Sequence, residues 1–169
     1  VNSERKVHDL NLPPAIGGDR SIYPRLRGLT AALPHPKLLS TKQPMRILVL
    51  TNLYPPHYVG GYELRCRDIT ESLKARGHAV YVLTSDHTVA SLDSPVDYPV
   101  ERSLRVHGFF GHPWLGVRDL LALEQHNNAR LVSAIKNFKP DLVHVWNLGG
   151  ISKSLALTLQ RLNIPTVFD

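Results

Sequence analysis

Two pairs of adjacent glycines are the residues best suited to bring a ligand close to the backbone of this chain. Gly60-Gly61 and Gly149-Gly150 each follow an apolar run, and each directly precedes a pattern typical of a helix. Glycine allows close approach to the backbone, and a helix N-terminus presents unpaired N–H groups at the positive end of the helix dipole. A phosphate or a carboxylate is the ligand that such a site binds. Either pair also suits a simple tight turn, and the residues alone leave both interpretations open.

Polar and aromatic side chains flank both glycine pairs, and we expect them to line one cleft. His57 and Tyr58 precede the first pair, and Glu63 follows it in the first helical turn, where negative charge is favoured. Trp146 suits stacking on the face of a ring-shaped ligand, or else forms an aromatic plug at the sheet edge. Asn147 suits a hydrogen bond to a hydroxyl, or else closes the turn. No catalytic residue follows from these types and spacings.

The chain lacks the two common phosphate-binding motifs of nucleotide enzymes. A dinucleotide fingerprint has G-x-G-x-x-G directly after the first strand, whereas ten residues, Asn52 to Gly61, follow that strand here. A Walker A loop needs Gly-Lys-Ser/Thr, which is absent. Dehydrogenases, epimerases and P-loop nucleotidases are therefore disfavoured. The single Cys66 and the spacing of His107 and His112 do not suit a metal site, so we expect no metal.

Alternating apolar runs and amphipathic patterns predict the elements that position these residues. Continuous apolar runs indicate strands buried on both faces over residues 45–51, 79–84, 141–146 and 164–168. A weaker pattern predicts a strand over residues 103–110, after a loop over 85–103. Helical spacing predicts helices over residues 62–76, 120–138 and 151–162. The long helix is expected to begin after an N-cap at Asp119 and to bury Leu121, Asn128, Leu131 and Ile135.

Strands that alternate with helices predict βαβ units and right-handed crossovers. The expected fold is α/β, a doubly wound, Rossmann-like parallel sheet with the strand order 3-2-1-4-5. Ligands bind such sheets beyond the C-terminal strand ends, where the strand order reverses. Both glycine pairs fall at that edge. The last predicted strand ends with the chain and would normally feed a covering helix, so we expect the domain to be incomplete at its C-terminus.

Composition separates residues 1–44 from residues 45–169. The first segment contains six of the 13 prolines and 7 Lys/Arg against 3 Asp/Glu, which predicts an irregular, basic N-terminal extension. The net charge of the whole chain is +6, but basic and aromatic residues do not interleave as in a nucleic-acid surface, so we expect no nucleic acid as partner. No apolar run reaches the ~18 residues of a membrane span, and no signal-peptide pattern opens the chain. A cytoplasmic location is expected, with a peripheral contact at the inner membrane face.

Two segments resemble the GT-B-fold glycosyltransferases of family 4. The segment MRILVLTNLYPPHYVGGYELRCRDITESLKARGHAVYVLTSDH contains Pro55-Pro56, Gly60-Gly61-x-Glu63 and Arg76-Gly77-His78 in the order typical of that family's opening. The segment KPDLVHVWNLGGISKSLALTLQRLNIPTVFD resembles a later strand, loop, helix and strand of the same family. The resemblance covers residues 45–169. Trp146 stands where some family members have a histidine two residues beyond His144, so a catalytic histidine is not carried over.

The resemblance implies a two-domain enzyme of which residues 45–169 form the N-terminal, acceptor-side half. Gly60 and Gly61 would face the donor diphosphate, and His57, Tyr58, Glu63, Trp146, Asn147, Gly149 and Gly150 would line the acceptor side of the cleft. Transfer from a nucleotide-sugar to a carbohydrate or lipid-linked acceptor would retain the anomeric configuration and need neither metal nor cofactor. A C-terminal domain would hold most of the donor, so this chain alone would be inactive. A non-catalytic sugar- or nucleotide-binding module, or another nucleotide-sugar enzyme such as an epimerase, is the alternative.

Overall fold

The computed structural model describes residues 43–89 and 96–169, which form five parallel strands and three helices. The predicted extension over residues 1–44 lies almost wholly outside the described part of the chain. In these two ranges, no helix combines the length and the apolar character that crossing a membrane requires. In chain order the elements are β1 (Arg46–Leu50), α1 (Gly61–Ala75), β2 (Ala79–Ser85), β3 (Val100–Leu104), α2 (Val117–Phe138), β4 (Leu142–Val145), α3 (Ser154–Arg161) and β5 (Thr166–Phe168).

The sheet has the order β3-β2-β1-β4-β5, and every neighbouring pair is parallel. This confirms the predicted doubly wound, Rossmann-like topology. The direction in which strands are added reverses at β1. Strands β2 and β3 are added on one side of β1, and strands β4 and β5 on the other. The loops that follow β1 and β4 therefore emerge side by side at the C-terminal edge of the sheet.

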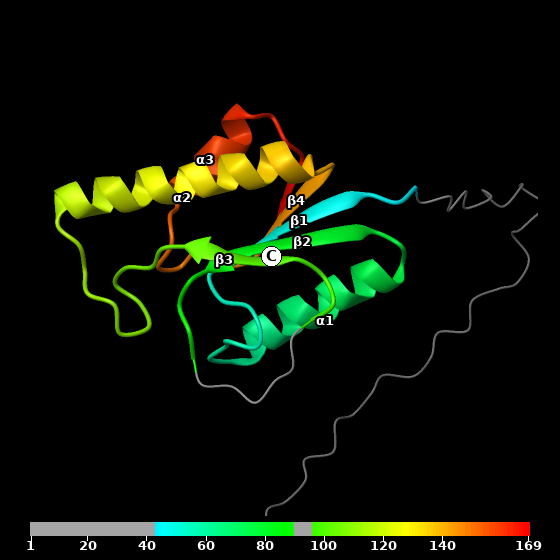
Figure 1. The fold of residues 1–169 in the computed structure, drawn as a ribbon, viewed down its shortest axis with the longest axis horizontal. Helices are drawn as coiled ribbons and strands as arrows, with labels where there is room; N and C mark the ends of the chain where they lie inside the picture. Colours follow the sequence, from blue (N-terminus) through cyan, green and yellow to red (C-terminus); the bar gives the residue numbers. More distant parts are fainter. Residues whose placement is uncertain (1–42, 90–95) are drawn as a thin grey trace, which may run out of the picture. The chain divides into compact units, whose positions relative to one another are not determined.

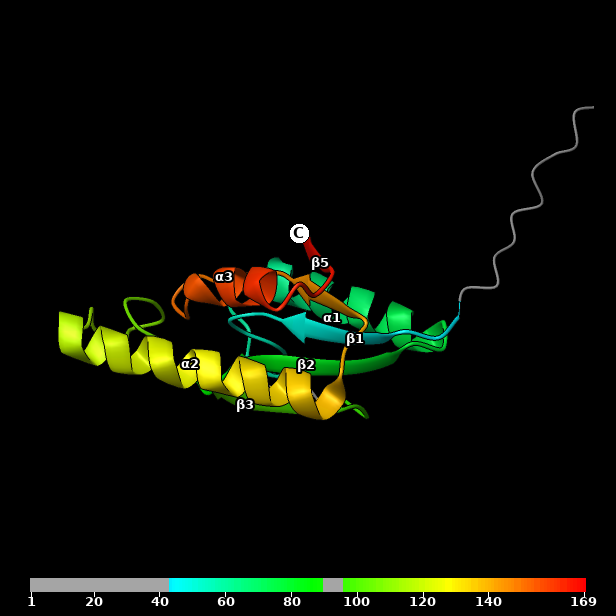
Figure 2. The ribbon, with the colours of Figure 1, turned by 90° about the horizontal axis from the view of Figure 1, so that it is seen from above.

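Helices cover both faces of the sheet, with α1 on one face and α2 and α3 on the other (Figures 1 and 2). The alternation of side chains along β1 assigns its residues to two cores. Leu48 and Leu50 pack in the core beneath α2 and α3, whereas Ile47 and Val49 pack in the core beneath α1. All four side chains are buried, which explains why the strand reads as a continuous apolar run.

The third strand is earlier and more polar than predicted. It spans Val100–Leu104 and not residues 103–110, so part of the segment predicted as a loop is a strand. The polar side chains of this edge strand are paired with other elements. Glu101 accepts a hydrogen bond from the Tyr81 hydroxyl at 2.5 Å and pairs with Arg130 of α2. An edge strand with satisfied polar side chains lacks the apolar signal on which the prediction relied.

The buried face of the long helix overlaps only in part with the one predicted, since Leu131 alone of the four predicted residues is fully buried. It begins at Val117 after an N-cap at Gly116, so Asp119 lies in its first turn. Leu121 is 59% exposed, and a fully buried Asn127 stands among the core residues of α2 instead. The Asn127 amide accepts a hydrogen bond from the Arg105 N–H at 2.8 Å and donates to the Arg105 carbonyl at 2.9 Å. The helix therefore holds the chain just after β3 through a polar residue that apolar periodicity does not register.

The third helix does not begin directly after Gly150, as expected, but at Ser154. Ile151 lies ahead of it and is buried in the core beneath α2 and α3. Ile151 enters the same core as Leu155 and Leu159 of α3, but from the loop that precedes the helix. Its spacing from these two leucines therefore resembled that of a helical residue.

Two leucines of α2 test this assignment of the buried face. Leu131→Ala is expected to lower the free energy of unfolding by about 2–5 kcal/mol, because the Leu131 side chain is fully buried. Leu121→Ala is expected to change the free energy of unfolding by less than about 0.5 kcal/mol. Urea denaturation of both variants measures the two values. Equal losses would mean that α2 packs with the face predicted from periodicity.

Candidate functional site

The loop between β1 and α1 is held in place from two sides. Tyr54 is fully buried, and its hydroxyl lies 2.5 Å from the hydroxyl of Tyr98. Arg102 of β3 donates hydrogen bonds from its two terminal nitrogens to the carbonyls of Tyr54 at 3.0 Å and Pro55 at 2.7 Å. Burial lowers the pKa of the Arg102 guanidinium. The loop that precedes Gly60 thus has a defined course before any ligand arrives.

The first glycine pair forms the start of α1. Gly60 is the N-cap, with an extended backbone at φ −153° and ψ −171°, and Gly61 is the first helical residue. Glu63 is buried, and its Oε2 accepts a hydrogen bond from the Gly60 N–H at 3.0 Å. The N–H groups of Gly61, Tyr62 and Glu63 also lie in the first turn, where a helix provides no intrahelical acceptor. Because Glu63 Oε2 takes the Gly60 N–H, these three N–H groups are the ones that the helix leaves available to an anion.

The two glycine pairs differ in what their own fold requires of them. A Cβ at Gly61 would meet no atom within 4 Å, and one at Gly60 would meet only Glu63 Oε2 at 3.9 Å. At Gly150, by contrast, φ is +78° and a Cβ would lie 2.8 Å from the Cβ of Phe109. The fold therefore requires glycine at position 150 but not at positions 60 and 61. The tight-turn interpretation accounts for Gly150, and it does not account for Gly60-Gly61.

The loop after β4 is closed by its own polar groups. The Asn147 side-chain oxygen accepts a hydrogen bond from the Gly149 N–H at 2.8 Å, which is the turn-closing role considered for it. Asn52 is the second residue after β1, and its side-chain amide donates a hydrogen bond to the Gly149 carbonyl at 2.8 Å. The loops after β1 and β4 are therefore joined directly, as their adjacent strands predict.

Trp146 is 5% exposed and lies between α1 and β4. Its ring packs edge-on against Tyr62 of α1, with 5.3 Å between ring centroids, and lies near His144. The Trp146 indole N–H has no hydrogen-bond partner among the described residues. The Tyr62 hydroxyl lies 3.2 Å from the Trp146 carbonyl and 3.0 Å from the Asp169 carbonyl. These contacts fix the first turn of α1 against the neighbouring strands.

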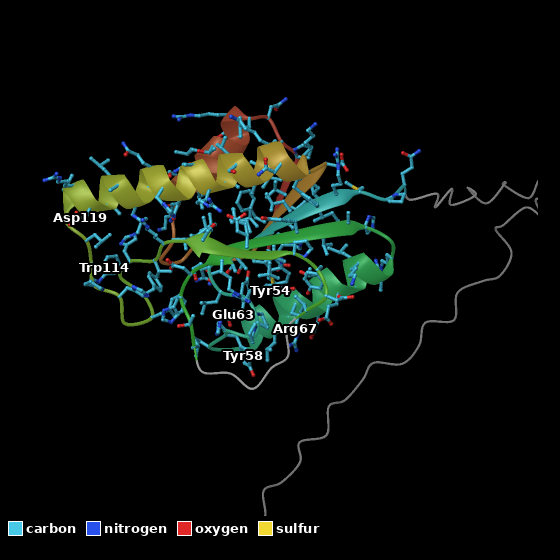
Figure 3. All side chains as sticks on the ribbon, in the orientation of Figure 1. Tyr54, Tyr58, Glu63, Arg67, Trp114 and Asp119 are labelled. Carbon is cyan, nitrogen blue, oxygen red and sulfur yellow. The ribbon has the colours of Figure 1, made fainter. Side chains whose placement is uncertain are left out.

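The remaining predicted cleft residues lie on the loop before α1. His57 is half-buried, and its Nδ1 lies 2.8 Å from the Val89 carbonyl. Tyr58 is half-buried and lies with Glu63 on the α1 side of the sheet (Figure 3). The structure thus brings the residues predicted from both glycine loops to one edge of the sheet. Among residues 43–89 and 96–169, no three His, Cys, Asp or Glu side chains are placed to hold a metal ion.

Two groups near the cleft were missed by sequence reasoning. Arg102 lies in a segment predicted as a loop, and its acceptors are backbone carbonyls, so no residue type signals the contact. His87, which follows β2, lies with its Nδ1 3.0 Å from Nε2 of His112. Burial, and then the charge of His112, lower the pKa of His87. Only the sheet order places these two histidines together.

The matching family model covers residues 59–168 and is described as Glycosyltransferase Family 4. A curated relative, the sulfoquinovosyl transferase SQD2 of Arabidopsis thaliana, is 28% identical over 141 residues. That alignment covers 83% of this chain and 26% of the relative, so the chain spans about a quarter of the relative's length.

Two solved structures are similar to part of this chain, each with 20% sequence identity. The C-terminal domain of a Pyrococcus furiosus hydrogenase gives a TM-score of 0.43, with 74% of this chain and 91% of that chain covered. The glycosyltransferase SsfS6 of Streptomyces sp. SF2575 gives a TM-score of 0.38, with 73% and 38% covered. Neither score is high enough to bear on function.

Alanine substitutions test whether the fold requires glycine at position 150 but not at position 61, through their effect on the free energy of unfolding. Gly150→Ala is expected to lower the free energy of unfolding by more than about 1 kcal/mol, because alanine is strained at φ +78° and its Cβ meets Phe109. Gly61→Ala is expected to leave that free energy unchanged or slightly higher, because alanine favours the helix and meets no atom. Urea denaturation provides the comparison. A large loss in Gly61→Ala would show that the fold itself requires this glycine.

His144 predicts how stability depends on pH. Burial lowers its pKa below the ordinary value of 6.5, and Asp169 only partly opposes this. The unfolded chain therefore binds the proton more readily, so the free energy of unfolding falls as the pH falls through about 6.5. Replacement by an uncharged residue, His144→Gln, should flatten the slope between about pH 7.5 and pH 5.5. Denaturation curves at several pH values test this, and parallel slopes for the two proteins would contradict it.

Proposed function

The chain belongs to Glycosyltransferase Family 4, and from that membership we propose that it forms the acceptor-side domain of an enzyme that transfers a sugar from a nucleotide-sugar donor. We propose further that transfer retains the anomeric configuration and needs no metal, as the sequence resemblance implies. The acceptor is a carbohydrate or a lipid-linked molecule. The observation that carries the proposal is the open start of α1 at Gly60-Gly61.

That open start supports a role in binding the donor diphosphate. Within the described residues, neither backbone conformation nor packing requires glycine at positions 60 and 61, which supports a role for the open backbone in binding a ligand. A diphosphate is an anion that needs close approach to N–H groups, and the N-terminus of a 15-residue helix provides both the groups and a favourable dipole. Because the Glu63 carboxylate occupies the Gly60 N–H, we assign the anion to the N–H groups of Gly61, Tyr62 and Glu63.

The same N–H groups would act on the transition state. As the bond between sugar and diphosphate breaks, negative charge grows on the leaving diphosphate, and fixed donors aimed at that charge lower the barrier. The Tyr62 hydroxyl contacts with the Trp146 and Asp169 carbonyls hold this turn in place, so little reorganisation is needed. We assign no general base, because retention in this proposal needs none from the described residues.

The proposal divides the work between two domains. The chain spans 26% of its curated relative, so a further domain has room to form the second wall of the cleft. Stabilisation of the leaving diphosphate and binding of the nucleotide would come mostly from that wall. We therefore expect residues 1–169 alone to bind a diphosphate weakly and to transfer no sugar.

Two valine variants test the site at the start of α1. Gly60→Val should weaken binding of inorganic pyrophosphate and of UDP-glucose about tenfold or more, because the side chain blocks the Gly61 and Tyr62 N–H groups. Gly116→Val is the matched control, since Gly116 is the N-cap of α2 and also has open space around it. Amide NMR titration of the 169-residue chain follows binding.

In the native chain, pyrophosphate is expected to shift the amide signals of Gly61, Tyr62 and Glu63. Shifts confined to other residues, or equal losses in both valine variants, would contradict the proposed donor site. Sugar transfer from UDP-glucose by the isolated chain would contradict the proposed division between domains.

A further inference from the structure

A separate cavity of about 340 Å³ lies at the C-terminal ends of β2 and β3, away from the start of α1. Its walls come from the residue after β2, the segment after β3 and the first turns of α2. Trp114 and Asp119 mark this corner of the molecule in Figure 3, on the segment between β3 and α2 and at the start of α2. The residues that matter to its chemistry are Asp86, Arg105, Val106, His112, Asp119 and Leu123.

The cavity combines uncommitted charged groups with an apolar base. The Asp86 and Asp119 carboxylates and the Arg105 guanidinium are exposed, and within residues 43–89 and 96–169 no hydrogen bond or ion pair joins them to another side chain. Val106 and Leu123 are 7% and 3% exposed and form the apolar part of the wall. Carboxylates accept hydrogen bonds from hydroxyls, and a guanidinium donates to ring and hydroxyl oxygens. The apolar side chains suit the C–H face of a ring.

The wall contributed by the segment after β3 has its shape set by internal contacts. Phe110 has a φ of 52° and stacks on His87, with 5.2 Å between ring centroids. At Gly108, with a φ of 65°, a Cβ would lie 2.5 Å from the Trp114 ring. His112, on the cavity wall, is held by His87 at 3.0 Å. These contacts give the wall a defined shape without a ligand.

The histidines connect the cavity to the proposed donor site along the edge of the sheet. His112 lines the cavity, His87 contacts it from the end of β2, and His57 lies in the loop before α1. His57 Nδ1 lies 2.8 Å from the carbonyl of Val89, two residues after His87, so the loop before α1 meets the segment that leaves β2. The three histidines therefore lie on adjoining segments between the cavity and the loop that precedes Gly60.

We propose that this cavity is a subsite for one sugar ring of a carbohydrate acceptor, recognised through hydroxyl contacts to Asp86 and Asp119 over the Val106 and Leu123 surface. The inference rests on the proposed function, whose acceptor class it narrows to a glycoside. The volume suits a single ring and leaves the rest of the acceptor to extend along the histidines.

The test uses the methyl glycosides of glucose, galactose and mannose as probes, titrated into the complete 169-residue chain. At least one probe is expected to shift the amide signals of Asp86, Val106 and Asp119. Asp86→Asn and Asp119→Asn should each weaken that binding about tenfold, because an amide replaces a charged hydrogen-bond acceptor. Asp68→Asn is the matched control on the exposed side of α1 and should bind like the native chain.

The outcomes separate this inference from the proposed function. If no glycoside shifts these amides, or if shifts map elsewhere, or if Asp119→Asn binds like Asp68→Asn, the subsite is overturned. Pyrophosphate binding at Gly61 would in that case still support the donor site. If glycosides bind in this cavity but pyrophosphate does not shift Gly61, the proposed donor site fails and the sugar subsite stands.

Discussion

The burial of β1 on both of its faces and along both of its edges sets the geometry of everything at the C-terminal edge of the sheet. Ile47 and Val49 pack beneath α1, and Leu48 and Leu50 pack beneath α2 and α3. Hydrogen bonds continue just past the strand, from the Trp146 N–H to the Leu50 carbonyl at 2.9 Å. A strand held in this way has no freedom to slide, because a shift of one residue would exchange its two cores. The loops after β1 and β4, and the start of α1, consequently begin from fixed points.

The same double burial explains which elements could be predicted from the sequence. Continuous apolar runs predict strands β1 and β2. Helical spacing predicts helix α1, and Gly77, whose φ is +87°, suits the end of that helix. Strand β3 could not be recognised, because Glu101 and Arg102 are polar residues whose partners lie far away in the sequence. The buried face of α2 was misread for a related reason, since Asn127 is a core residue only because Arg105 satisfies its amide. Polar residues of this kind become interpretable only when their partners are known.

The candidate site shows the same division. Its glycine pairs and flanking residues could be identified from type and spacing, because parallel strands bring their C-terminal ends to one edge. The different roles of the two pairs could not. Gly150 is required by Phe109, a residue that lies 41 positions earlier in the chain, whereas none of the residues that the structure describes requires glycine at positions 60 and 61. The cavity at the ends of β2 and β3 was also beyond prediction, since three separate segments contribute to its walls.

Arg102 holds the loop before α1 through main-chain carbonyls, at Tyr54 and Pro55, and through no side chain of that loop. Hydrogen bonds to main-chain carbonyls do not depend on which side chains the loop carries. The half-buried Tyr58 and the exposed Val59, which follow, can therefore be exchanged for other residues while the loop keeps its path. A scaffold with this property separates evolvability from stability: side chains at the rim of the proposed acceptor cleft can change without a matching change in the anchor beneath them.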